Sequence, residues 1–137
     1  MRASWGLTNK ILTGEKSVET RWYKTARPPW GKVTEGDTIF FKDSGKPVSI
    51  KATAGKVRCI SELNPLKVKD LLNEYCKHDG IAEKDIPAFY PLFKDKKYCM
   101  IVSLKNPKSI TPFDIDKSAF GAMAAWITVS DVNKIKV

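Results

Sequence analysis

Residues 11–23, ILTGEKSVETRWY, contain the transition that decides the fold of this chain. The segment Thr8–Gly14 predicts a brief helix, and Gly14 is expected to close it because glycine readily adopts the left-handed conformation found after a helix C-terminus. Lys16–Tyr23 is predicted to be extended, because apolar and polar side chains alternate along it. The side chains expected on its more apolar face are Val18, Thr20 and Trp22.

Five further stretches are predicted to be strands, because β-branched and aromatic residues lie between turn signals. They are Met1–Leu7, Thr38–Lys42, Val48–Ile60, Tyr98–Leu104 and Ala122–Val129, the last with a short helix as the alternative. Gly55 is expected to bend or bulge its strand. Asn64-Pro65 predicts the start of a helix that ends near Asp79-Gly80, and Glu83–Phe89 predicts a second short helix that Pro91 stops.

This order predicts an α+β, mostly β fold: a small antiparallel β-barrel of about five or six strands with two or three short helices inserted. The chain has 137 residues, of which 42% are hydrophobic and 28% charged, and contains no internal repeat or long linker. A single domain spanning residues 1–137 is therefore expected. No apolar run long enough to cross a membrane occurs, and no signal peptide is expected, so the sequence predicts a cytoplasmic protein that contacts no membrane.

The positive charge is concentrated in the N-terminal half. The formal net charge is +9, and residues 1–58 carry twelve basic and five acidic side chains, against twelve and ten in residues 59–137. All four arginines lie in the first half. The three cysteines and single histidine suggest neither a zinc site nor a disulfide framework, so no metal or cofactor is expected. A catalytic triad around His78 is disfavoured, because Lys77 and Asp79 are typical of a solvated helix end.

Cations and aromatic rings alternate in residues 21–32, RWYKTARPPWGK. Single-stranded nucleic-acid sites combine these residue types, because cations hold the backbone while rings stack on bases. This segment is therefore a candidate binding surface, formed by Arg21, Trp22, Lys24, Arg27 and Trp30. Two plainer interpretations stay open: a solubilising basic surface, and tryptophans that serve as core anchors.

The residues Gly14, Lys16, Glu19 and Arg21 match the pattern Gly-x-Lys-x-x-Glu-x-Arg. In this motif, and in the Gly36-Asp37 turn that follows a basic loop, the chain resembles the ASCH family. The resemblance implies a PUA-like β-barrel with a cleft for RNA or a nucleoside, and the EVE family shares that barrel. The plainer interpretation is that Glu19 and Arg21 pair to hold the mouth of the barrel.

Some ASCH relatives are enzymes, including an amidohydrolase acting on N4-acetylcytidine and proteins described as ribonucleases. Lys16 matches the catalytic lysine of the amidohydrolase. Lys16 and Glu19 are the candidate acid–base pair of an enzyme, because their side chains could supply the acid and base for attack by a ribose 2′-OH. Glu19 occupies the position of the amidohydrolase's catalytic threonine, and Ser17 and Thr20 lie at neighbouring positions. That enzyme also has a more distant catalytic glutamate, for which Glu62 and Glu74 are candidates by residue type alone.

Lys117 and Phe120 precede the last predicted strand. A closed barrel brings its last strand close to its first, so both residues are expected to complete the cleft. The alternative is that Phe120 and Trp126 are core residues. The leading hypothesis is therefore binding of RNA or a modified nucleoside or nucleotide. The alternatives are a nucleoside amidohydrolase or ribonuclease, and a basic domain that binds an acidic protein.

Overall fold

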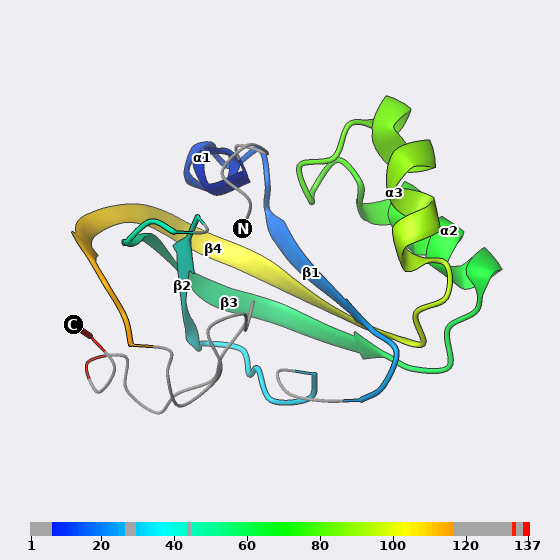
Figure 1. The fold of residues 1–137 in the computed structure, drawn as a ribbon, viewed down its shortest axis with the longest axis horizontal. Coiled ribbons are helices and arrows are strands. Elements are labelled where there is room, and N and C mark those ends of the chain that lie inside the picture. The colour runs from blue at the N-terminus through cyan, green and yellow to red at the C-terminus, as the bar shows by residue number, and fades with distance from the viewer. Residues whose placement is uncertain (1–6, 27–29, 44, 117–132, 134–135) are drawn as a thin grey trace.

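A computed structural model describes residues 7–26, 30–43, 45–116, 133 and 136–137. Its element order is α1 (Leu7–Thr13), β1 (Val18–Tyr23), β2 (Thr38–Lys42), β3 (Val48–Ile60), α2 (Pro65–Tyr75), the 3-10 turn η2 (Glu83–Asp85), α3 (Ile86–Phe93) and β4 (Tyr98–Phe113). The strands form one antiparallel sheet in the order β1-β4-β3-β2, curled like half a barrel (Figure 1). The expected mostly β class is confirmed, with four strands in the described residues. No helix of this part of the chain is long and apolar enough to cross a membrane.

Most predicted elements near the motif are confirmed. Gly14 has φ +85 after α1, so it occupies the left-handed conformation expected of it. The Asn64 side chain accepts a hydrogen bond from the Lys67 N–H and caps α2. β2 and β3 have the predicted bounds, and the pairing register shifts between Ala54 and Val57, where Gly55 was expected to cause a bulge.

Two predictions at prolines are wrong. Pro91 lies inside α3 instead of stopping it; the proline removes one backbone hydrogen bond, and the helix continues only to Phe93. The last described strand runs to Phe113 instead of Leu104. Asn106 and Pro107 concealed this extension in the sequence, because they lie where the register shifts between the Thr53–Lys105 and Lys51–Lys108 pairs, and a bulge accommodates proline within a sheet.

Other predictions fall at the ends of the chain. A first strand was expected over Met1–Leu7. Leu7 instead begins α1, and residues 1–6 lie outside the described part of the chain. The predicted strand Ala122–Val129 also lies outside the described residues, as do Lys117, Phe120 and Trp126.

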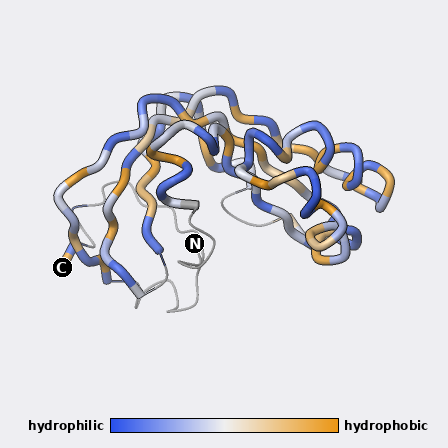
Figure 2. Tube along the Cα trace, turned by 90° about the horizontal axis from the view of Figure 1, so that it is seen from above, coloured by the Kyte–Doolittle hydropathy of each residue, from blue (hydrophilic) through white to orange (hydrophobic). Residues whose placement is uncertain are grey.

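β4 separates two hydrophobic clusters. Cys99 and Ile101 face one cluster, which α2 and α3 cover, while Met100 and Val102 face the other, which includes Ile11 of α1. Figure 2 shows hydrophobic and hydrophilic positions alternating along the strands, as expected when side chains point to opposite faces in turn. β1 lies beside β4, so its side chains also alternate between the two faces of the sheet. Val18 and Trp22 pack against the cluster beneath α2 and α3, while Glu19, opposite Val102, lies on the other face.

Candidate ligand-binding site

The start of β1 meets the turn that follows α2. Lys16 and Asp79 form an antiparallel bridge, and the backbone N–H groups of Ser17 and Val18 donate to the His78 carbonyl at 2.6 and 3.0 Å. The Lys16 N–H also donates to the Lys10 carbonyl at 2.9 Å, which connects the strand to α1. Backbone pairing therefore brings the motif at residue 16 next to residue 79, far along the sequence.

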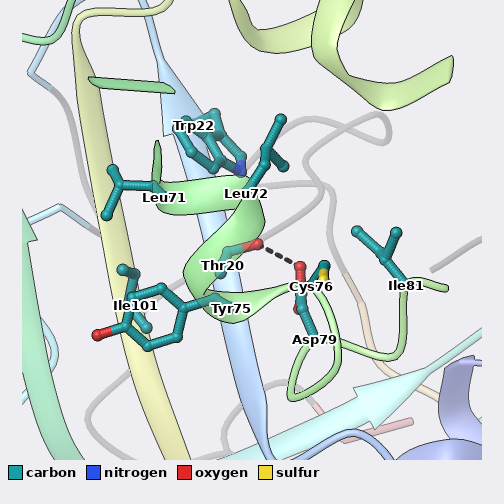
Figure 3. A pocket seen from close by; sticks show the side chains of 9 residues that line it. All are labelled: Thr20, Trp22, Leu71, Leu72, Tyr75, Cys76, Asp79, Ile81 and Ile101. Atoms are coloured by element: carbon teal, nitrogen blue, oxygen red, sulfur yellow. Dashed lines mark hydrogen bonds between the residues drawn. The ribbon is translucent and has the colours of Figure 1, made fainter. Parts of the chain in front are cut away.

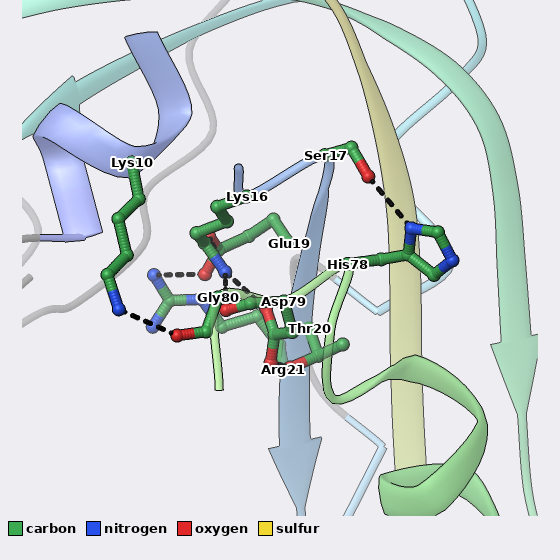
Figure 4. A network of polar contacts seen from close by, with 9 residues as sticks. All are labelled: Lys10, Lys16, Ser17, Glu19, Thr20, Arg21, His78, Asp79 and Gly80. Carbon is green, nitrogen blue, oxygen red and sulfur yellow. Dashed lines mark hydrogen bonds and ion pairs between the residues drawn. The ribbon is translucent and has the colours of Figure 1, made fainter. Parts of the chain in front are cut away.

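Four charged side chains form a chain of alternating sign at this junction (Figure 4). Lys16 Nζ contacts the Asp79 carboxylate and lies 3.3 Å from Glu19 Oε2, and the Arg21 guanidinium lies 3.3 Å from Glu19 Oε1. Lys16, Glu19 and Asp79 are 3%, 5% and 9% exposed. The Lys16–Glu19 contact is ionic and lacks hydrogen-bond alignment, because Oε2 accepts no hydrogen bond in the described structure. We call Lys16, Glu19, Arg21 and Asp79 the ion cluster; its formal charges balance.

Burial raises the pKa of Asp79 from 3.8 to about 6. The nearby positive charge of Lys16 lowers this pKa and the negative charge of Glu19 raises it, but the loss of hydration is the largest effect. Asp79 thus changes its charge close to neutral pH. A carboxyl group with this property can exchange protons with a bound molecule.

Thr20 connects the ion cluster to a small pocket beneath α2 (Figure 3). Its hydroxyl donates to Asp79 Oδ2 at 2.7 Å, and both side chains line the pocket. The remaining lining residues are mainly apolar or aromatic: Trp22, Leu71, Leu72, Tyr75, Cys76, Ile81 and Ile101. The pocket has space for about one water molecule. It combines two polar groups with two aromatic rings.

Two further polar contacts surround the cluster. Lys10 Nζ donates to the Gly80 carbonyl at 3.0 Å, and Ser17 Oγ lies 3.3 Å from His78 Nδ1. Asp79 does not complete a serine–histidine–aspartate arrangement, because its carboxylate contacts Lys16 and Thr20 instead. Among the described residues, no group of three or more His, Cys, Asp or Glu side chains is placed to hold a metal ion.

Comparison with known proteins adds information on the fold. No family model matches the sequence, and no curated protein matches it. The structure is similar to the crystal structure of ASCH from Zymomonas mobilis, with a TM-score of 0.59 and 16% identity over 83% of this chain and 69% of that chain. The chain has the fold of an ASCH domain. Two single-residue variants of the same Zymomonas protein are also similar, with TM-scores of 0.58 and 0.54, identities of 15% and 16%, and coverage of 83% and 79% of this chain and 71% and 67% of theirs.

Within this ASCH fold, part of the predicted site comes together. Lys16, Glu19 and Arg21 form the ion cluster with Asp79, and Glu19 and Arg21 share the strand face expected of them. Trp22 lies on the other face of β1, where it lines the pocket and stacks on Phe93 with 5.1 Å between ring centroids.

Of the other predicted binding residues, the structure describes Lys24 and Trp30. Lys24 is exposed beyond the far end of β1, about 26 Å along the extended chain from Lys16. Trp30 packs edge-on against Tyr98 beside the cluster that contains Ile11, an arrangement typical of a core anchor. Arg27, Lys117 and Phe120 lie outside the described residues.

Asp79 is the residue that sequence reasoning missed, and its expected place at a solvated helix end is wrong. Its side chain is buried because the turn after α2 pairs with the start of β1, which places Lys16 and Thr20 against it. This pairing joins segments far apart in the sequence, so no local pattern signalled it. Glu62 and Glu74, the candidates by type for a distant acidic residue, are both exposed, and Glu74 pairs with Arg58 at 3.7 Å.

Proposed function

We propose that this ASCH-fold protein binds RNA, or a modified nucleoside or nucleotide, by holding a base in the pocket beneath α2. The observation that carries the proposal is a carboxylate and a hydroxyl, from Asp79 and Thr20, in a pocket walled by Trp22 and Tyr75. Bases offer N–H groups to carboxylates and flat faces to aromatic rings. The net charge of +9 favours a ligand that carries phosphate.

The ion cluster supports this function by orienting Asp79. Lys16 contacts Asp79 Oδ1, and Thr20 holds Oδ2, so the carboxylate has a defined direction at the pocket wall. A base is larger than the present space, so binding requires side chains around the pocket to move apart. Side-chain changes of this size are common when ligands bind.

Tryptophan fluorescence provides the test, because Trp22 lines the pocket. The intact protein is titrated with short single-stranded RNA, matched DNA and a panel of free modified nucleosides at two salt concentrations. We expect Asp79→Asn and Thr20→Val to weaken binding about tenfold, because each removes one polar partner of the base. Asp70→Asn is the matched control, since Asp70 is an exposed acidic residue of α2, and binding by this variant is expected to stay unchanged.

Trp22→Phe identifies the source of the signal, because the chain contains four tryptophans. Loss of the fluorescence response in this variant, with binding still detected by calorimetry, would assign the response to the pocket. A folded wild-type protein that responds to none of these ligands would refute the proposal and direct the search to acidic protein partners.

A second candidate function is hydrolysis of an acylated nucleoside or of RNA. The observation that favours it is the Thr20 hydroxyl on a buried carboxyl whose pKa is about 6, beside the ammonium group of Lys16. Asp79 can accept a proton at neutral pH and return it, as general acid–base catalysis requires. We expect any turnover of acetylated cytidine or short RNA to be lost in Asp79→Asn and kept in Asp70→Asn, which changes an exposed residue of α2. Absence of turnover in the wild type would exclude these substrates.

A further inference from the structure

One face of the sheet is covered by helices at one end and carries exposed lysines at the other. Cys99 and Ile101 of β4 face α2 and α3. On β3, Ile50, Ala52 and Ala54 belong to the opposite cluster. Because side chains alternate along a strand, Lys51 points to the same side of the sheet as α2 and α3, but beyond them.

Two lysines lie directly opposite each other on this face. Lys51 of β3 and Lys108 of β4 are register partners, and both are exposed. Neither forms an ion pair with any residue that the structure describes. Like charges directly opposite each other across a sheet destabilise it. An anion bound between the two side chains would remove this repulsion.

Aromatic rings and further cations adjoin this pair. Phe40 of β2 is the register partner of Lys51, and its ring contacts Phe113 edge-on at 5.9 Å. Lys136 Nζ lies 4.4 Å from the centre of the Phe113 ring. Lys105 has a partner in Glu35, at 3.9 Å, but both side chains are more than half exposed, so this pair offsets little of its charge. We call Phe40, Lys51, Lys105, Lys108, Phe113 and Lys136 the Lys51 face.

We propose that the Lys51 face binds the sugar–phosphate backbone of a single-stranded RNA whose base occupies the pocket. Cations with interspersed rings suit such a strand, because the cations neutralise phosphates and the rings stack on bases. The inference rests on the proposed function, and it makes the ligand a polynucleotide, since a free nucleoside cannot reach both places.

The pocket and the Lys51 face lie on the same side of the sheet. Arg58 of β3 pairs in register with Ile101, so it lies on the same side of the sheet, and its guanidinium donates to the Tyr75 hydroxyl at 3.0 Å. Tyr75 lines the pocket. Seven residues of β3, about 23 Å, separate Arg58 from Lys51. An extended strand of RNA can cover this distance with several nucleotides.

The test compares two double variants of the full chain. Lys51→Gln with Lys108→Gln removes two charges from the Lys51 face, and Lys69→Gln with Lys84→Gln removes two exposed charges near α2 and η2. The ligands are a single-stranded RNA of about twelve nucleotides and the nucleoside that binds the pocket most tightly. For the RNA, we expect the first variant to raise the dissociation constant roughly fivefold at low salt, and the slope of log affinity against log salt to become shallower by about 1.4. Nucleoside binding is expected to stay unchanged.

The outcomes separate this inference from the proposed function. If the two double variants bind RNA with equal affinity and salt slope, while Asp79→Asn and Thr20→Val still weaken binding, RNA does not bind the Lys51 face. That result would overturn this inference and leave the proposed function intact. Failure of the wild type to bind RNA or nucleosides would overturn both. Both double variants should retain the wild-type circular dichroism spectrum, because all four lysines are exposed; weaker RNA binding by the folded Lys51 face variant alone supports the inference.

Discussion

Replacement of Lys16 by methionine is expected to lower the free energy of unfolding by about 3–5 kcal/mol at neutral pH. Methionine preserves the length of the side chain and its apolar part but removes the ammonium group that contacts Asp79 and Glu19. Both carboxylates are almost fully buried, so each loses a partner that hydration cannot replace. Arg21 still contacts Glu19, and most of the loss therefore arises at Asp79. Urea denaturation followed by circular dichroism measures it.

Two controls make this prediction specific. Lys67→Met, at an exposed position of α2, should change stability by no more than about 0.5 kcal/mol. Adding Asp79→Asn to Lys16→Met should restore part of the stability, because the buried negative charge goes with its partner. A loss under about 1 kcal/mol for Lys16→Met, unchanged by the second substitution, would show that the cluster contributes little to folding.

Stability should fall as pH rises through the range in which Asp79 titrates. The ordinary pKa of an aspartate carboxyl is 3.8, and burial raises the pKa of Asp79 to about 6 in the folded protein. Between these values the folded protein holds a proton that the unfolded chain has released, so the folded state binds more protons and the free energy of unfolding decreases with pH. The contribution is on the order of 3 kcal/mol, present in full below the lower pKa and lost above the higher one.

Urea denaturation at a series of pH values, for the wild type and Asp79→Asn, measures this contribution. Other carboxyl groups titrate in both proteins, so the difference between the two curves isolates Asp79. We expect the wild type to lose stability relative to the variant between about pH 4 and pH 6, and the difference to be constant above that range. A difference that grows in the opposite direction would mean that Lys16 outweighs burial and lowers the pKa of Asp79.

The fold could be predicted well wherever the signals were local. Gly14, Asn64 and Gly55 act on their own neighbours, and the structure confirms the helix end, the helix cap and the bulge. Pro91 and Pro107 were misleading because their usual effect was overridden by their surroundings: a helix that was about to end, and a bulge in a long paired strand. Local propensity describes what an isolated segment prefers, and tertiary packing can reverse it.

Only the part of the candidate site that lies on β1 could be predicted from the sequence. Lys16, Glu19 and Arg21 lie within six residues and could be grouped directly. Asp79 is 63 residues away from Lys16, and only the backbone pairing of His78 and Asp79 with the start of β1 brings it there. Because a single sequence contains no information on which distant segments pair, the acidic partner could not be assigned, and Asp79 was expected at a solvated helix end instead.

β4 belongs to both hydrophobic clusters at once, through Cys99 and Ile101 on one face and Met100 and Val102 on the other. Shifting this strand by one residue would exchange the two sets, placing side chains shaped for one cluster into the other. The strand therefore has one register in which either cluster can form. Opening of β4 disrupts both clusters, so we expect the backbone amides on both sides of this strand to exchange with solvent through one shared opening event.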